Sequence, residues 1–290
     1  MQRVRVLLVI LFVCAASGGP RANVPAEDPR QFLNAMAQAA DRVRDYTMTL
    51  VSQEWNGHGL GPAERLAAKW ARPFKMYYKK LNAPHLGREV LFADGWNDGK
   101  LKVSLHIWPI NLGVNINPHG DLAMADNTHP IDESSLIYFV GVILDNFRRA
   151  DKRGEATVED RGRETILGRD CRLVRIVTSQ SEISYTLLRA ETLWDVAKRF
   201  GVAMAPVLHE NRDLGWAVPG DAKPGQTIHV PRYYAARIDL WIDDALSLPL
   251  VAEIYDERGT MFERFEHHDL RVNVGLGPLD FSPANPAYKF

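Results

Sequence analysis

The stretch AARIDLWIDDALSLPLVAEIYDERGTMFERFEHHD, residues 235–269, decides the class of fold. Apolar and polar residues alternate in it over three segments, as in strands that bury one face. The segments are residues 235–242, 248–255 and 260–269. The two connections between them are short and rich in Asp, which favours tight turns. This pattern predicts three consecutive antiparallel strands.

A second series of strands is predicted in the first half of the chain. Alternation begins at Tyr46 and continues to Phe92. Asn97-Asp98-Gly99 is a typical hairpin turn, and alternation resumes after it from Leu101 to Leu105. These segments predict a second antiparallel meander with one apolar face.

Two helices are expected beside these strands. Residues 26–45 carry apolar side chains at helical spacing, and residues 136–144 are almost entirely apolar, with Asp132 or Ser134 available as the N-cap. We expect residues 110–130, which are rich in Asn, Pro, His and Gly, to form a long loop. The order of elements predicts an α+β fold in which a curved antiparallel sheet closes over helices.

The N-terminus has the three parts of a secretory signal: a basic start, an apolar run from Val6 to Ala16, and small residues after it. We expect residues 1–22 to be a signal peptide, with the mature protein beginning between Gly18 and Asn23, in the periplasm or cell envelope.

Loss of Cys14 leaves Cys171 without a partner, and its apolar neighbours indicate a buried, inert thiol. The chain has 35 Lys and Arg against 36 Asp and Glu, so no basic excess points to nucleic acid.

Residues 185–231 interrupt the second meander with a pattern of strand, helix, helix and strand. The segments YTLLRAETLWDVAKRFGV (185–202), LHENRDL (208–214) and KPGQTIHVP (223–231) resemble the LysM module, a small cell-wall binding domain. Antiparallel pairing of its first and last strands would place its ends roughly 5 Å apart, as a hairpin tip requires. The expected organisation is a discontinuous host domain, residues 23–184 and 232–290, with this module inserted.

The LysM resemblance implies binding of peptidoglycan, a glycan that contains N-acetylglucosamine. Its groove maps onto the loop before the first helix and the turn before the last strand. The expected contact residues are Ala190, Glu191, Thr192, Leu193, Trp194, Asn211, Lys223, Pro224, Gly225, Gln226 and Thr227. Ala190-Glu191 stands where the module usually has Gly-Asp.

The host, on its strand pattern and its tail from Ile238 to Tyr288, resembles an uncharacterised bacterial family of the LolA-like type. The resemblance implies a half-barrel with helices on its concave side and a cavity for a lipid or a lipoprotein acyl chain. Large apolar side chains on one face of the first strands and of the apolar helix are the expected lining. They are Met48, Leu50, Trp70, Phe74, Met76, Leu136, Val140 and Leu144.

No catalytic motif stands out in the sequence. It has no G-x-S-x-G and no H-E-x-x-H. His267 and Asp269 share a strand face in regular alternation, but two ligands fall short of a metal site. We therefore expect a non-catalytic protein without a metal or cofactor. The alternatives are a cell-wall hydrolase with an unrecognised site and an envelope sensor that binds a protein partner.

Overall fold

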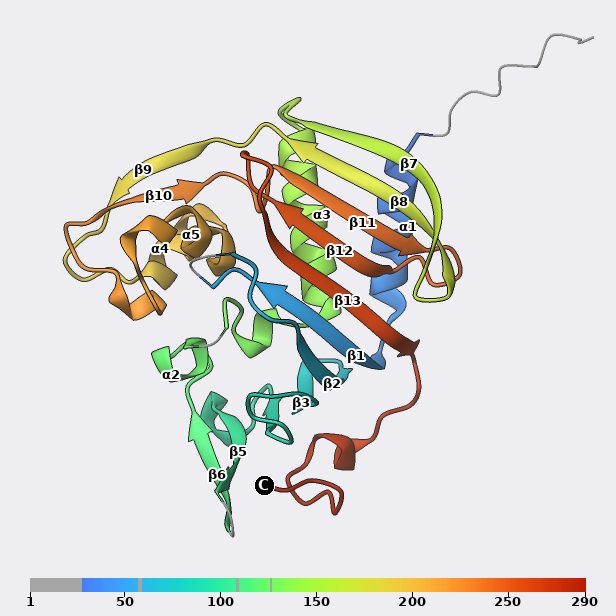
Figure 1. Ribbon diagram of the computed structural model, residues 1–290, viewed down its shortest axis with the longest axis vertical. Coiled ribbons are helices and arrows are strands. Elements are labelled where there is room, and N and C mark those ends of the chain that lie inside the picture. Colours follow the sequence, from blue (N-terminus) through green and yellow to red (C-terminus); the bar gives the residue numbers. More distant parts are fainter. Residues whose placement is uncertain (1–27, 57–58, 108–109, 126) are drawn as a thin grey trace, which may run out of the picture.

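The computed structural model describes residues 28–56, 59–107, 110–125 and 127–290, and within it eleven strands form one open antiparallel sheet (Figure 1). The strand order is β6-β5-β4-β3-β2-β1-β13-β12-β11-β8-β7. In chain order the strands are β1 (Asp45–Glu54), β2 (Glu64–Ala71), β3 (Lys75–Lys80), β4 (Glu89–Ala93), β5 (Leu101–Ile107), β6 (Ile110–Ile116), β7 (Ala156–Ile166), β8 (Arg169–Thr178), β11 (Arg237–Asp243), β12 (Pro249–Tyr255) and β13 (Met261–Val272). The signal peptide predicted for residues 1–22 lies outside the described residues.

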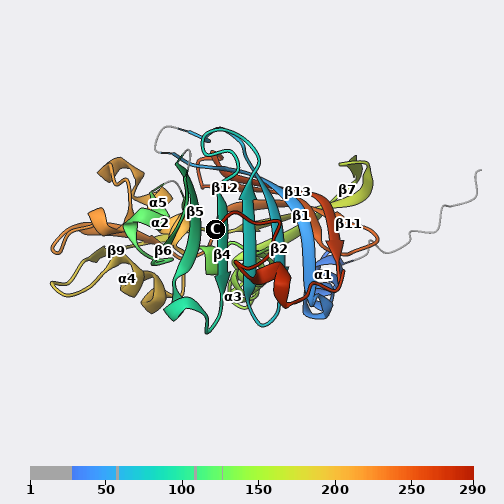
Figure 2. The ribbon, with the colours of Figure 1, turned by 90° about the horizontal axis from the view of Figure 1, so that it is seen from below.

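Helices α1 (Arg30–Arg42) and α3 (Leu136–Asp151) lie against one face of the sheet (Figures 1 and 2). Side chains of both helices share one buried core with strands from both halves of the sheet, among them Trp70 and Leu240. The sheet therefore curves around the helices, and the predicted α+β plan with helices on the concave side is confirmed.

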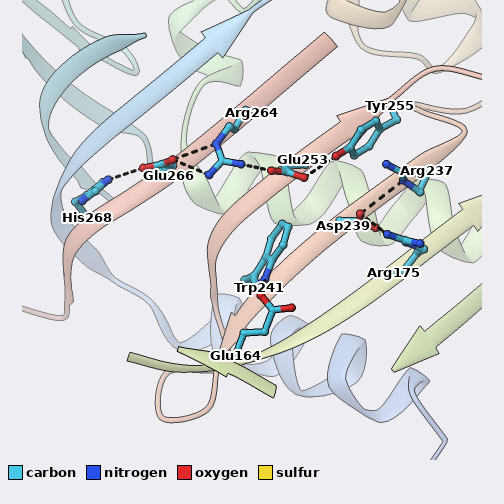
Figure 3. A network of polar contacts seen from close by, with 10 residues as sticks. All are labelled: Glu164, Arg175, Arg237, Asp239, Trp241, Glu253, Tyr255, Arg264, Glu266 and His268. Carbon is cyan, nitrogen blue, oxygen red and sulfur yellow. Dashed lines mark hydrogen bonds and ion pairs between the residues drawn. The ribbon is translucent and has the colours of Figure 1, made fainter. Parts of the chain in front are cut away.

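Along β8, β11, β12 and β13, alternation places polar side chains on the opposite face of the sheet (Figure 3). Asp239 accepts hydrogen bonds from Nε and Nη2 of Arg175, at 2.6 and 2.8 Å, and Arg264 pairs with Glu253 and Glu266. Opposite charges on neighbouring strands thus pair across β8, β11, β12 and β13.

The prediction of a loop over residues 110–130 was wrong in two places. Ile110–Ile116 forms β6, which pairs with β5, and Asp121–Met124 forms the short helix α2. The alternation of Ile110, Leu112 and Val114 is the strand signal, and the Asn and Gly between them conceal it.

The prediction for the start of α3 was also wrong: Ser135, not Asp132 or Ser134, is the N-cap, and its side chain accepts a hydrogen bond from the Tyr138 amide at 3.0 Å.

Between β8 and β11 the chain forms a βααβ unit, residues 182–231, with a separate two-stranded sheet. Its elements are β9 (Glu182–Thr186), α4 (Leu193–Phe200), α5 (Met204–Glu210), the 3-10 turn η4 (Pro219–Asp221) and β10 (Thr227–Pro231). Side chains such as Val196, Val207 and Ile228 make a core of its own. Because β8 and β11 still pair directly, the unit leaves the large sheet continuous.

The βααβ unit also packs on the host. The sequence predicted its insertion at a hairpin tip but not these contacts. His209 of α5 stacks on Phe262 with ring centroids 4.3 Å apart, and its Nε2 lies 3.1 Å from Asp256. Trp194 stacks on His119 at 4.5 Å. The unit therefore has a fixed place beside the end of β1 and the start of β13 (Figure 1). None of the helices in the described part of the chain is long and apolar enough to cross a membrane.

Candidate functional site: two adjoining cavities

The first cavity, the sheet cavity, lies between the concave face of β1–β6 and β13, the start of α3, and residues 117–125 and 127–135, which we call the cover segment. Its volume is about 220 Å³. Most of the wall is apolar, with Leu66, Val103 and Ile116 from the sheet and Phe139 from α3. Leu122 of the cover segment belongs to the wall and is 74% exposed, so an apolar side chain marks the opening to solvent.

Of the residues expected to line an apolar cavity, Leu50 and Leu136 line this one. The other six are placed in or against the closed core: Met48, Trp70, Phe74, Met76, Val140 and Leu144. Their part of the concave face is filled by packing with helices and other strands; Trp70, for example, stacks on Tyr46 at 5.3 Å. The cavity therefore lies further along the same strands, where the cover segment takes the place of a helix.

A buried polar cluster joins the cover segment to the sheet at one end of the cavity. His129 Nε2 lies 2.8 Å from Glu263 Oε1, and the Tyr234 hydroxyl donates to Glu263 Oε2 at 2.6 Å. Burial opposes protonation of His129, but the Glu263 carboxylate outweighs it and raises the pKa of His129 to about 9. At neutral pH the cluster is therefore an ion pair, and it holds the cover segment against β13.

His267 presents a neutral imidazole to the sheet cavity. Burial lowers its pKa to about 4, and its Nδ1 donates to the Pro249 carbonyl at 2.7 Å. Asp269, expected to share its strand face, has a positive φ of 53° that breaks the alternation, and it is exposed. Over the described ranges no group of three or more His, Cys, Asp or Glu side chains could hold a metal ion.

The second cavity, the junction cavity, lies between the host and the βααβ unit and has a volume of about 440 Å³. The host contributes Trp55 and Phe262, and the unit contributes His209, Arg212 and Trp216. The two cavities share wall residues, namely Ser52, Glu54, Glu64, His85 and Asn127. They therefore adjoin at the end of β1.

The residues expected to bind peptidoglycan fall into two groups. Leu193 is buried in the core of the βααβ unit, and Asn211 is buried with its amide bonded to Val207 and to both backbone groups of His229. Thr192 forms a capping box with Asp195, and Glu191 accepts from the Tyr185 hydroxyl at 2.6 Å. Thr192 is nevertheless exposed, and the remaining residues, which are Ala190, Trp194, Lys223, Pro224, Gly225, Gln226 and Thr227, are at least partly exposed.

The turn before β10 lies beside the loop before α4. The Gly225 amide donates to the Leu187 carbonyl at 2.8 Å, and the Leu187 amide donates to the Gln226 carbonyl at 2.9 Å. Gly225 has a φ of +84°, which favours glycine, and a side chain added there would meet nothing within 4 Å. The approach to these loops is open at Gly225, whereas Trp194 is covered on one side by His119 of the host.

Sequence reasoning missed the cover segment and both cavity tryptophans. The cover segment was interpreted as part of a loop, and Trp55 and Trp216 belong to no periodic pattern.

Cys171 has no exposed surface and is a free thiol, and burial raises its pKa to about 11, as expected of an inert group.

The family described as "Protein of unknown function (DUF1571)" matches residues 43–207 and 226–290. The chain belongs to the DUF1571 family. The match covers all eleven strands of the large sheet, α3, the host walls of both cavities, and β9, α4 and β10 of the βααβ unit. Between its two matched parts it leaves out residues 208–225, which include His209, Arg212 and Trp216 of the junction cavity.

No curated protein sequence matches this DUF1571 chain. Among solved structures it is similar to MucB, with 13% identity and a TM-score of 0.45, over 88% of this chain and 62% of MucB. It is also similar to the lipoprotein LppX of Mycobacterium tuberculosis, with 9% identity and a TM-score of 0.40, over 86% of this chain and 97% of LppX. A third is a LolA superfamily protein from Nitrosomonas europaea, with 8% identity and a TM-score of 0.32, over 89% of this chain and 98% of that protein.

Proposed function

We propose that the protein is a non-catalytic, LolA-like binding protein of the periplasm or cell envelope, which holds a lipid or a lipoprotein acyl chain in the sheet cavity. The observation that carries the proposal is a cavity of about 220 Å³ with a mostly apolar wall, which opens to solvent beside the closed core. A concave, mostly apolar site with the exposed Leu122 at its opening suits a chain-like ligand.

A fluorescent fatty acid tests this proposal. Dansyl-labelled undecanoic acid should bind the delipidated protein saturably and be displaced by decanoate. Leu66→Trp, which fills the cavity from β2, should abolish the signal, whereas Leu112→Trp on β6, where the side chain is 49% exposed and outside the wall, should not change it. Equal binding by Leu66→Trp and wild type would place the ligand elsewhere, and no binding by wild type would reject the activity.

We propose second that the βααβ unit is a LysM module that binds peptidoglycan. The support is its order of elements, its capped first helix, and an open turn at Gly225 beside the loop before α4. Gly225→Trp should abolish pelleting with cell-wall sacculi and leave the unfolding midpoint of the host unchanged. Equal pelleting would reject this site, and clearing of the sacculi would favour the alternative of a cell-wall hydrolase.

The proposal also includes export by the predicted signal peptide. N-terminal sequencing of the protein from the cell envelope should find a start between Gly18 and Asn23. Material that begins at Met1 would reject cleavage. If the mature protein captures no lipid but binds an envelope protein, the remaining alternative, a sensor with a protein partner, would replace lipid binding.

A further inference from the structure

Strand β6 lies at one end of the large sheet and has a free edge (Figures 1 and 2). In an antiparallel pair every second residue turns its N–H and C=O away from the neighbouring strand, so half of these groups of β6 point away from β5. Over the described ranges, no backbone group of Ile110–Ile116 bonds to an element other than β5. Leu112, in the middle of β6, is 49% exposed. The edge is therefore open to a further strand.

The opposite edge strand, β7, shows how this sheet protects an edge. β7 has a bulge at Gly162, where φ is +99°. It also carries charged side chains along its length, namely Glu159, Asp160, Arg161, Arg163 and Glu164. β6 has neither device: its register with β5 is unbroken, and its seven residues include no charged residue and no proline. Because an unprotected apolar edge readily pairs with another strand, we expect β6 to have a partner.

The order of residues in β6 is complementary to a second copy of itself. The strand reads INLGVNI, so that outwards from Gly113 each side has Leu or Val, then Asn, then Ile. If two copies pair antiparallel with Gly113 opposite Gly113, Leu112 of each copy lies opposite Val114 of the other. Val114 is partly buried against the main core, and alternation places Leu112 on the same concave face. This pairing joins apolar side chains across a twofold axis and covers the exposed Leu112.

The outer face at the same position also accepts a second copy. Gly113 has no side chain there, and the end of the Lys102 side chain lies over it, with Cε 3.0 Å from the position of an added Cβ. Two copies would bring the two Lys102 ammoniums towards the axis on this face, where water and salt screen their repulsion.

We propose that the protein forms a twofold homodimer in which two copies of β6 pair antiparallel, with Gly113 opposite Gly113, so that the two sheets become continuous. The proposal goes beyond lipid and peptidoglycan binding and depends on neither. Two paired seven-residue strands bury little surface compared with stable complexes. We therefore expect a weak dimer that dissociates at roughly micromolar concentration.

Sedimentation velocity of the mature protein from roughly 1 to 100 μM tests the proposal. The sedimentation coefficient should rise with concentration from that of a monomer towards that of a dimer. Leu112→Lys should stay monomeric, because it places a charge opposite Val114 of the second copy. Leu279→Lys is the matched control: Leu279 is 54% exposed and lies in the C-terminal segment away from this edge, so this variant should dimerise like wild type.

Oxidative cross-linking tests the register. Residues directly opposite each other have Cα atoms about 4.5–5.5 Å apart, which a disulfide can bridge, so Gly113→Cys should form a covalent dimer. The new side chain needs only a small shift of the flexible end of Lys102. Asn115→Cys is the control on the same face, because its two copies would lie about 14 Å apart. The native Cys171 is buried and should not react.

Three results would overturn the proposal. A wild-type protein that stays monomeric at every concentration would leave the edge to a strand of another protein. A dimer of Leu112→Lys as stable as that of wild type would place the interface elsewhere. Equal cross-linking of Gly113→Cys and Asn115→Cys would exclude the register, and this comparison still decides if Leu112→Lys does not fold.

Discussion

The free energy of unfolding should fall as the pH rises above 6.5, because the stabilisation from the buried His129–Glu263 ion pair is then lost. Burial works against the charged imidazole, but Glu263 raises the pKa of His129 to about 9, from an ordinary value of 6.5. Between these values the folded protein holds a proton that the unfolded chain has lost, so the free energy of unfolding falls by about 1.4 kcal/mol per pH unit. This contribution, roughly 3 kcal/mol, is complete below pH 6.5 and is lost as the pH rises through about 9.

Glu263→Gln should remove this dependence and lower the free energy of unfolding by about 3 kcal/mol near pH 6.5. Urea unfolding followed by tryptophan fluorescence, between pH 6.5 and about 9, measures both effects. Burial lowers the pKa of His267 to about 4, which is below this pH range. Burial raises the pKa of Glu210 to about 7, which is at the lower end of the range. The control is Asp132→Asn, because the His119–Asp132 pair has side chains 37% and 35% exposed and should contribute less than about 1 kcal/mol.

The same pH slope in wild type and Glu263→Gln would refute the reasoning, because it would mean that His129 is not the group that titrates. Should Glu263→Gln fail to fold, His129→Gln removes the titrating ring and keeps a hydrogen-bond donor for Glu263. Its slope should then be flat over the same range.

Three further predictions concern individual contacts. Asn211→Ala should destabilise the βααβ unit by about 2–4 kcal/mol, because it removes two hydrogen bonds to His229 of β10 and one to Val207 of α5; hydrogen exchange should rise in β10 and stay slow in β12. Gly220→Ala should speed proteolysis of the cover segment only slightly, because its Cβ would push aside the exposed Asp121 carboxylate and remove the hydrogen bond that the Gly220 amide donates to it, whereas Gly141→Ala, with nothing within 4 Å, should have no effect. Cys171 should react with Ellman's reagent only after unfolding, since the thiol is fully buried and its pKa is about 11.

The sheet was predictable because its signal is local. Alternation at Leu240, Ile254 and Phe265 fixes which face of each strand is buried, and a one-residue shift would expose that whole face. The same reasoning failed at β6, where Asn111 and Gly113 between the apolar residues are typical of turns. Pairing with β5 outweighs that local preference.

The candidate site was less predictable, because alternation gives the buried face but not what covers it. Met76 and Leu50 point to the same concave face, yet Met76 is in the closed core while Leu50 also borders the sheet cavity. The difference depends on the cover segment, whose position is set by long-range contacts such as His129 to Glu263. Likewise, only the packing of the βααβ unit on Phe262 brings Trp55 and Trp216 to one cavity.

The stacking of Trp194 on His119 allows a test of whether Trp194 contacts peptidoglycan. A glycan that uses the Trp194 ring must compete with the imidazole, whose centroid lies 4.5 Å from it, whereas a glycan held by the backbone at Gly225 meets no such competitor. His119→Ala frees the ring and should increase pelleting with sacculi if Trp194 belongs to the groove. Asp132→Asn removes the carboxylate that orients His119 but keeps the stacked ring, so it should pellet like wild type. Unchanged pelleting of His119→Ala, together with loss in Gly225→Trp, would confine the groove to the two loops and exclude Trp194.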